Sequence, residues 1–225
     1  MRLGLERRTS MRQHAMSAID LRELAAQVMG RMPRPDRDGV PLALMTYRRL
    51  AEGAPVRVDA LASAVGLSES RAREVLDTCE VMIDEAGAIV GFGGLALEET
   101  AHRFEVDGVR LYTWCAWDAL FLPPLLGKSA SVSSPCPVTG QVVNLIVNPG
   151  GIASTEPRAA VMSFPVPTYS GEDVVSGFCQ YVLLFASAQA GELWTAKHSR
   201  TFLLSIEDAF ELGGLVNAAR YGPAR

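Results

Sequence analysis

Histidine is scarce in this chain. Only three histidines occur in 225 residues, and these are His14, His102 and His198. They are far apart, and none lies at the short spacing from a second histidine or from a pair of cysteines that zinc sites use. The sequence therefore gives little support to a zinc site.

A long run of basic residues is also absent. Lysine and arginine total 21 against 25 acidic residues, so the formal net charge is −4. Proteins that bind the phosphate backbone of a nucleic acid need a concentrated positive surface. The composition therefore argues against a nucleic-acid partner.

No apolar run is long enough to cross a membrane. A membrane-spanning helix needs roughly 18 consecutive apolar residues, whereas the nearest candidate, Ala116 to Leu126, is shorter and contains Asp118, Pro123 and Pro124. The first residues also lack the apolar stretch and cleavage site of a secretory signal. We therefore expect no membrane partner and a cytoplasmic location, and we predict that residues 1–19 form a disordered tail.

Cysteine is infrequent but informative. The chain contains four cysteines, Cys79, Cys115, Cys136 and Cys179. In a reducing compartment thiols stay free, so metal binding or catalysis explains such residues better than a disulfide framework does. The surroundings of each cysteine therefore bear on its function.

The first part of the chain has the pattern of a winged helix. Helices are predicted near 21–32, 42–51 and 69–80, with a turn at Gly66 and a helix cap at Ser68. Two short strands around a turn are predicted over 81–90. We therefore predict that residues 20–92 form a helical, winged-helix-like region.

A winged helix commonly binds DNA, but the charges of this one argue otherwise. Arg71 and Arg73 lie on the last predicted helix among four acidic residues, which leaves little positive charge for phosphate groups. We therefore favour a structural or protein-contact role for this region.

From residue 93 to residue 225 the pattern is α+β. Short segments that alternate apolar and polar residues are separated by turn pairs such as Asp107-Gly108, as expected of antiparallel hairpins. Helices are predicted over 194–198 and 206–220. No glycine pattern of a phosphate loop or a dinucleotide site occurs. We predict a mixed or antiparallel, β-rich catalytic core with flanking helices.

Cys115 and Asp118 are the most informative pair. A helix is predicted from Cys115 to Leu126, and residues three apart share one face of a helix, so the thiol and the carboxyl are expected to converge. A simpler explanation stays open, in which Cys115 is a small buried residue and Asp118 is a first-turn acid. However, a carboxyl within the apolar segment 117–121 costs free energy if it is desolvated, which suggests a function.

The other cysteines differ in their surroundings. Cys179 precedes the apolar segment 181–185, which predicts a buried strand. Cys136 lies between two prolines in a turn, where a structural role is favoured, and Cys79 ends a helix. Two thiols and a carboxyl, from Cys115, Cys179 and Asp118, suit a soft metal. Nearby apolar residues form either a dry pocket or ordinary core, and they are Trp114, Trp117, Leu120, Phe121 and Phe178.

Several motifs resemble the alkylmercury lyase family, also called organomercurial lyases. The similarity extends from about Pro41 to Asn217. Because the motifs are widely separated and occur in the same order, chance explains them poorly. They are Phe104–Asp107, Arg110–Asp118, Val132–Cys136, Phe178-Cys179, Phe185–Ser187 and Trp194–His198.

The resemblance implies protonolytic cleavage of the carbon–mercury bond of alkyl- and arylmercury compounds to a hydrocarbon and Hg(II). It assigns Cys115, Asp118 and Cys179 as the catalytic and mercury-binding residues and Cys136 as a structural cysteine. No separate cofactor is implied, because mercury belongs to the substrate. Small cytosolic thiols and a mercuric reductase are the implied recipients of Hg(II). One departure is Gln180, where some members of the family carry a second cysteine.

Two other functions remain open. One is a non-catalytic protein that holds mercury or copper between Cys115 and Cys179, and the other is a winged-helix regulator that senses a soft metal. A carrier has no need of Asp118 as a proton donor, and a regulator needs a DNA-binding surface. Both therefore fit the residues less well than a lyase does.

Overall fold

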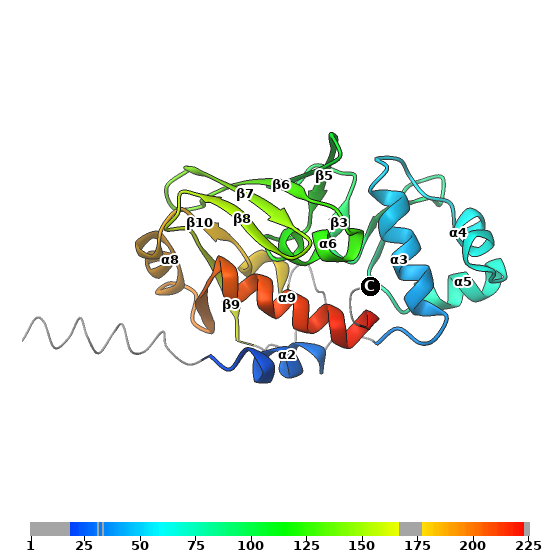
Figure 1. Cartoon of the computed structure of the whole chain (residues 1–225), viewed down its shortest axis with the longest axis horizontal. Coiled ribbons are helices and arrows are strands. Elements are labelled where there is room, and N and C mark those ends of the chain that lie inside the picture. Colours follow the sequence, from blue (N-terminus) through cyan, green and yellow to red (C-terminus); the bar gives the residue numbers. More distant parts are fainter. Residues whose placement is uncertain (1–18, 31, 33, 167–176, 223–225) are drawn as a thin grey trace, which may run out of the picture.

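A computed structural model of the chain describes residues 19–30, 32, 34–166 and 177–222. Residues 1–18 of the predicted tail lie outside this part. The described residues form two antiparallel sheets, with helices beneath the larger sheet and at one end of it (Figure 1). Within these residues, no helix combines the length and the apolar character needed to cross a membrane.

The larger sheet has eight strands in the order β1-β2-β3-β5-β4-β6-β7-β8. Each neighbouring pair is antiparallel. Buried and exposed residues alternate along β4 and β7, so one face of these strands packs on the core. The strands are β1 Val81–Ile83, β2 Ile89–Phe92, β3 Leu95–Ala96, β4 His102–Val106, β5 Val109–Thr113, β6 Ala130–Pro135, β7 Val142–Asn148 and β8 Gly151–Glu156.

The smaller sheet has three strands in the order β10-β9-β11. Its central strand, β9, is buried along its whole length. The helix α8 packs against β9 and β11. The bounds are β9 Val161–Pro165, β10 Leu184–Phe185, β11 Thr201–Ser205 and α8 Ala188–Thr195.

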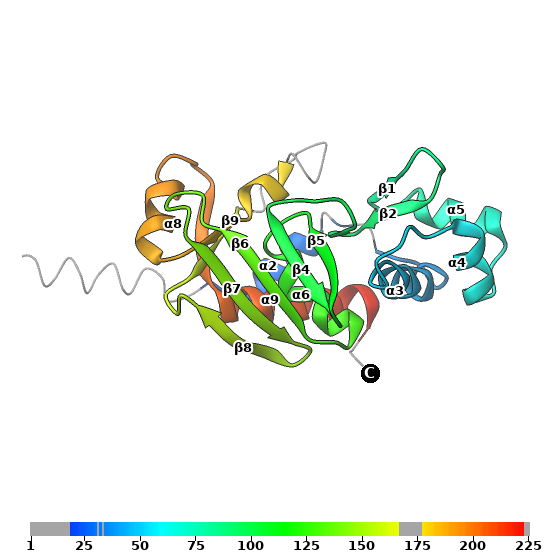
Figure 2. The same ribbon diagram turned by 90° about the horizontal axis from the view of Figure 1, so that it is seen from above.

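Three helices stand together at one end of the molecule (Figure 2). The second ends at Val65 and is followed by Gly66, whose φ of +73° is favourable for glycine. Ser68 then caps the third helix by accepting a hydrogen bond from a backbone N–H of its first turn. The predicted turn and cap are therefore present. The helices are α3 Gly39–Leu50, α4 Val58–Val65 and α5 Glu69–Leu76.

Two further helices lie beneath the larger sheet. The long C-terminal helix α9 (Ile206–Tyr221) packs against β8, β9 and β11, and α2 (Leu21–Met29) packs along α9 (Figure 1). Asp20 starts α2, because its carboxylate accepts hydrogen bonds from two backbone N–H groups of the first turn.

The helix α6 (Asp118–Leu126) is buried between the larger sheet and α9. Two hydrogen bonds join this region to α9. The Nε1 of Trp117 donates to the carbonyl of Ala209 at 2.9 Å, and the Nδ2 of Asn217 donates to the carbonyl of Phe121 at 2.8 Å. The start of α6 is therefore held in a defined position.

The predicted α+β class with an antiparallel sheet is confirmed. The helix predicted over 194–198 exists with other bounds, because α8 begins at Ala188 and ends at Thr195. Its start is set by Ser187, whose side chain accepts a hydrogen bond from the N–H of Ala190 at 3.2 Å. Because Ser187 caps this helix, α8 begins six residues before the start that the sequence predicted.

The contact between Asn217 and Phe121 gives a prediction for stability. Asn217→Ala leaves the buried carbonyl of Phe121 without its partner, so the free energy of unfolding should fall by about 1–3 kcal/mol. Urea denaturation measures this change. Asn144→Ala, at an exposed position of β7, is the control and should stay within about 0.5 kcal/mol of the wild type. Equal losses in both variants would contradict the role given to Asn217.

Candidate active site

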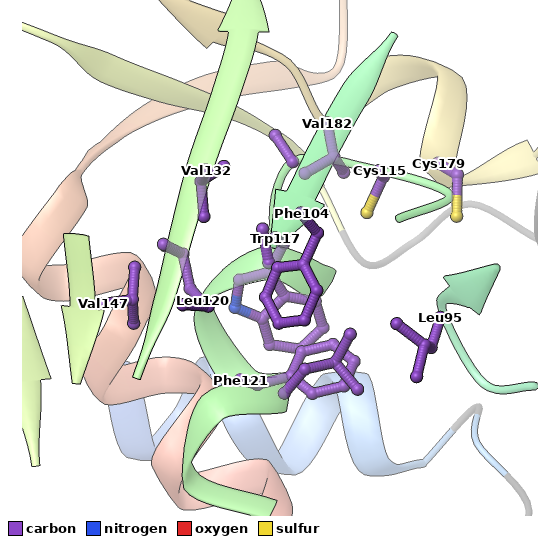
Figure 3. Packing of buried hydrophobic residues seen from close by; sticks show 14 of the residues in the cluster. Leu95, Phe104, Cys115, Trp117, Leu120, Phe121, Val132, Val147, Cys179 and Val182 are labelled. Atoms are coloured by element: carbon purple, nitrogen blue, oxygen red, sulfur yellow. The ribbon is translucent and has the colours of Figure 1, made fainter. Parts of the chain in front are cut away.

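The three predicted site residues come together in the structure. One ligand atom each from Cys115, Asp118 and Cys179 lies within 4.8 Å of the other two, and all three residues are buried. Figure 3 shows the two cysteine side chains next to each other and pointing the same way, although they come from segments far apart in the sequence. The described cysteines are free thiols. The arrangement is a buried pair of thiols with one carboxyl.

Cys115 lies in the short turn between β5 and α6. The hydroxyl of Thr113, at the end of β5, donates to the carbonyl of Cys115 at 2.8 Å. The N–H of Ala116 donates to the carbonyl of Val182 at 3.2 Å, which brings the turn next to the segment that carries Cys179. Hydrogen bonds from the side chain of Thr113 and from the backbone of Ala116 therefore hold the turn that carries this thiol.

The prediction that Cys115 and Asp118 share one face of a helix is wrong. The helix α6 begins only at Asp118. Instead, the Oδ2 of Asp118 accepts a hydrogen bond from the backbone N–H of Cys115 at 2.7 Å. The carboxyl thus turns back over the preceding turn, and the two residues converge for this reason.

Burial raises the pKa of Asp118 from its ordinary value of 3.8 to about 7. Hydrogen bonds from the amide and the thiol of Cys115 favour the charged carboxylate, but they only partly offset desolvation. At neutral pH the carboxyl is therefore poised between its protonated and deprotonated forms, which is the condition for a group that transfers protons.

Burial also raises the pKa of Cys115 well above 9.0, and the hydrogen bond to Cys179 and the negative charge of Asp118 act in the same direction. Cys115 is therefore a neutral thiol in the resting protein. A soft metal ion changes this protonation state, because a thiol that binds such an ion loses its proton.

The strand predicted at Cys179 is wrong. Cys179 begins a short 3₁₀ helix, η1 (Cys179–Tyr181), and Gln180 within it is exposed. Ser163 on β9 holds this segment, because its hydroxyl donates to the carbonyl of Tyr181 at 2.7 Å and accepts from the N–H of Leu183 at 3.2 Å. The N–H of Ser163 also donates to the carbonyl of Leu183 at 3.0 Å, so β9 holds the residues that follow η1.

Aromatic rings pack beside the two thiols. Trp117 makes edge-to-face contacts with Phe121, Phe164 and Phe178, with ring centroids 5.1, 5.3 and 6.1 Å apart. Trp117, Leu120 and Phe121 are buried core residues (Figure 3). Among the aromatic residues proposed from the sequence, Trp114 and Phe178 are only half-buried. The thiols therefore lie in a largely apolar environment.

Cys136 is buried in a separate turn. Its N–H donates to the carbonyl of Gln141, and its carbonyl accepts from the N–H of Gly140, both at 2.8 Å. Burial raises the pKa of its thiol, but hydrogen bonds from Thr139 and from the backbone at Ala186 outweigh this and lower it overall. In the described part of the chain, the metal-ligand cluster comprises Cys115, Asp118 and Cys179, without Cys136.

Two residues near the site were missing from the sequence prediction. One is Ser163, described above, for which an isolated serine in an apolar strand is a weak signal. The other is Gly94. It lies against the site, because a Cβ atom placed on it would be 2.5 Å from the Cγ of Asp118. The pair Gly93-Gly94 between apolar residues is a recognisable hairpin signal and was available in the sequence.

The raised pKa of Asp118 predicts a dependence of stability on pH. The folded protein holds the proton of this carboxyl up to about pH 7, whereas the unfolded chain releases it near pH 3.8. The contribution of Asp118 to stability therefore falls as the pH rises from about 4 to 7. Asp118→Asn removes this loss, so the variant should be more stable at pH 8 by on the order of a few kcal/mol.

Urea denaturation of both proteins at pH 4, 6 and 8 measures this effect. The difference between Asp118→Asn and the wild type should grow with pH over this range and be smallest at pH 4. Other titrating groups, such as the buried His102, are common to both proteins and cancel in the comparison. A difference in stability that stays constant from pH 4 to pH 8 would show that Asp118 does not have a raised pKa.

Comparisons with known proteins identify relatives of this chain. The model of the alkylmercury lyase family (MerB) matches residues 95–217. Alkylmercury lyase of Staphylococcus epidermidis is 44% identical over 167 residues, which cover 74% of this chain and 76% of that protein. Alkylmercury lyase of Pseudomonas putida is 42% identical over 176 residues, or 78% of this chain and 82% of that protein.

A solved structure is similar in fold. The crystal structure of the mercury-bound form of MerB2 aligns with a TM-score of 0.72 at 22% sequence identity, covering 88% of this chain and 97% of that chain. The fold, the family model and the curated relatives agree with the resemblance that the motifs indicated. The chain belongs to the alkylmercury lyase family.

Proposed function

We propose that Cys115, Cys179 and Asp118 carry out the alkylmercury lyase reaction in this protein, the cleavage of a carbon–mercury bond to a hydrocarbon and Hg(II). The observation that supports this proposal is the convergence of two free, buried thiols and one buried carboxyl within 4.8 Å. Mercury enters with the substrate, so the reaction needs no further cofactor.

Capture of the substrate is an exchange of thiols. An organomercurial in the cell carries a small thiolate, and the thiol of Cys115 replaces it. The Cys115 sulfur bonds to mercury, and the proton of Cys115 leaves with the displaced thiol, so the step is balanced in protons. Mercury is a soft metal and prefers sulfur ligands, which favours this exchange.

Cleavage needs a second sulfur and a proton. Cys179 gives its proton to Asp118, and its sulfur bonds to mercury, which increases the electron density on the bond to carbon. Asp118 then donates the proton to the carbon as that bond breaks, and the hydrocarbon leaves. The products are the hydrocarbon and Hg(II) bound by Cys115 and Cys179. The pKa of Asp118, about 7, suits a group that must both accept and donate this proton.

The apolar surroundings assist the proton transfer. Trp117 is almost fully buried and Phe178 packs on it, so the thiols are shielded from much of the surrounding water. Exclusion of water strengthens the electrostatic interactions within a site and keeps competing proton donors away. We infer that the organic group of the substrate lies next to these aromatic rings.

Release of Hg(II) requires other thiols. We infer that small cytosolic thiols, or a mercuric reductase, take the ion from Cys115 and Cys179 and return both to the thiol form. A cytoplasmic location fits this step, because a reducing compartment supplies such thiols and keeps the cysteines free.

For the N-terminal part we propose a winged-helix-like region over 20–92 that precedes a catalytic core over 93–225. Its support is the order of α3, α4 and α5 followed by the hairpin β1–β2. We further infer that this region does not bind DNA. Arg71 is paired with Asp36, Asp38 and Glu74, which leaves little charge for phosphate groups.

Membership of the lyase family favours this function over a metal carrier or a metal-sensing regulator. The buried carboxyl separates the lyase from the carrier, because a protein that only holds mercury needs no proton donor beside its thiols. Incubation of the protein with phenylmercury acetate and excess thiol under anaerobic conditions distinguishes these functions. The lyase releases benzene, which gas chromatography detects, whereas a carrier releases none.

Substitution of single cysteines tests the requirement for two sulfurs. Cys115→Ala and Cys179→Ala should abolish benzene release, because each removes a sulfur that binds mercury. Cys79→Ala is the matched control, since Cys79 is half-buried and lies outside the cluster, and it should keep the wild-type rate. Cys136→Ala should keep activity and lower the free energy of unfolding by about 1 kcal/mol. Full turnover by Cys179→Ala would rule out the mechanism with two sulfurs.

Asp118→Asn tests the proton donor. The amide resembles the carboxyl in shape but cannot carry the proton, so the variant should still bind phenylmercury while benzene release falls by on the order of 10²- to 10⁴-fold. Single-turnover measurement with native mass spectrometry separates the bound phenylmercury from the Hg(II) product. A normal rate of benzene release in this variant would mean that the proton comes from another group.

A further inference from the structure

The turn between β2 and β3 lies directly against the carboxyl of Asp118. These strands are antiparallel, and Phe92 pairs with Leu95, so Gly93 and Gly94 form a two-residue hairpin loop. Both have positive φ angles, +50° and +101°, as in a type I′ turn. This loop is where the N-terminal part of the chain meets the site.

Gly94 leaves no room for a side chain. A Cβ atom on this residue would lie 2.5 Å from the Cγ of Asp118, 2.6 Å from its Oδ1 and 2.9 Å from its Cβ. The contact includes the Cβ of Asp118, so rotation of the carboxyl alone would not relieve it. The other oxygen, Oδ2, is held by the N–H of Cys115. The backbone of Gly94 therefore forms a wall beside the Oδ1 of Asp118.

Hydrogen bonds hold this wall in place from two sides. The carbonyl of Gly94 accepts from the N–H of Trp114 at 2.9 Å, and Trp114 directly precedes Cys115. The carbonyl of Gly93 accepts from the hydroxyl of Tyr47 on α3 at 3.0 Å. Tyr47 is fully buried. The loop is thus fixed both to the turn that carries the first thiol and to the N-terminal helices.

We propose that Gly94 is a positioning residue for the proton donor, and that the Gly93-Gly94 loop, supported by Tyr47, holds the carboxyl of Asp118 at the two thiols. This inference rests on the proposed role of Asp118. A proton is transferred efficiently only over a short, well-aligned contact, and a displacement of about 1 Å can cost 10²-fold in rate. The N-terminal helices then contribute to catalysis through this loop.

Gly94→Ala tests the proposal, with Gly87→Ala as the matched control. Gly87 also has a positive φ, +77°, but a Cβ atom there meets nothing within 4 Å. Both variants therefore carry the strain of a positive φ, and only Gly94→Ala displaces Asp118. Phenylmercury is the substrate. We expect kcat for benzene release to fall by about 10²-fold in Gly94→Ala with KM and phenylmercury binding unchanged, and by less than about twofold in Gly87→Ala.

A double variant adds a readout that a purely structural role would not change. In the Asp118→Asn background the proton donor is already lost, so Gly94→Ala should cause no further loss of benzene release. If Gly94→Ala keeps the wild-type rate, or if its loss simply adds to that of Asp118→Asn, the proposal is wrong. If Asp118→Asn itself releases benzene normally, the proposed proton donor is wrong, which is a separate result.

Tyr47→Phe keeps the test possible if Gly94→Ala does not fold. This change removes the hydroxyl, which binds the carbonyl of Gly93 and lies 3.4 Å from the hydroxyl of Tyr221, and it retains the ring that packs on Phe92. We expect benzene release to fall by about threefold with phenylmercury binding unchanged, in line with the loss of the hydrogen bond to Gly93. A wild-type rate in Tyr47→Phe, together with an unfolded Gly94→Ala, would overturn the proposal.

Discussion

The burial of the Asp118 carboxyl beside two thiols is the interaction on which the rest of the site depends. Removal of water raises the pKa of this group to about 7, so near neutral pH the site can keep or give up one proton. The same burial keeps Cys115 protonated until a soft metal ion arrives. One physical effect therefore prepares Asp118 and Cys115 for the roles that we propose for them.

Several elements far apart in the sequence maintain this burial. The helix α6 starts at Asp118 and is held by α9 through Asn217, while Ser163 on β9 fixes the segment that carries Cys179. The Gly93-Gly94 loop closes the side of the carboxyl near Oδ1. A buried, incompletely compensated carboxyl lowers stability at neutral pH. The fold offsets this cost by packing apolar residues around the site. The role that we propose for Asp118 gives a reason to keep the buried carboxyl.

The residues that come together at the site were easier to predict from the sequence than the geometry that brings them together. Motifs that resemble those of a family and occur in the same order indicated Cys115, Asp118 and Cys179. The alternation of apolar and polar residues indicated an antiparallel α+β fold. The true start of α6 was not predictable from local pattern, because it depends on tertiary contacts with α9. Similarly, the apolar residues after Cys179 suggested a strand, but local backbone hydrogen bonds close a 3₁₀ turn there, and Ser163 on β9 binds the residues at its end.

The protonation of Asp118 can be measured directly. Carbon-13 labelling of the aspartate side chains gives one carboxyl resonance for each residue, and the spectrum of Asp118→Asn identifies that of Asp118. A titration from pH 3 to pH 9 then follows its chemical shift in the resting protein. We predict a midpoint of about pH 7. A midpoint near the ordinary aspartate value of 3.8 would contradict the proposal that burial prepares this carboxyl to carry the proton.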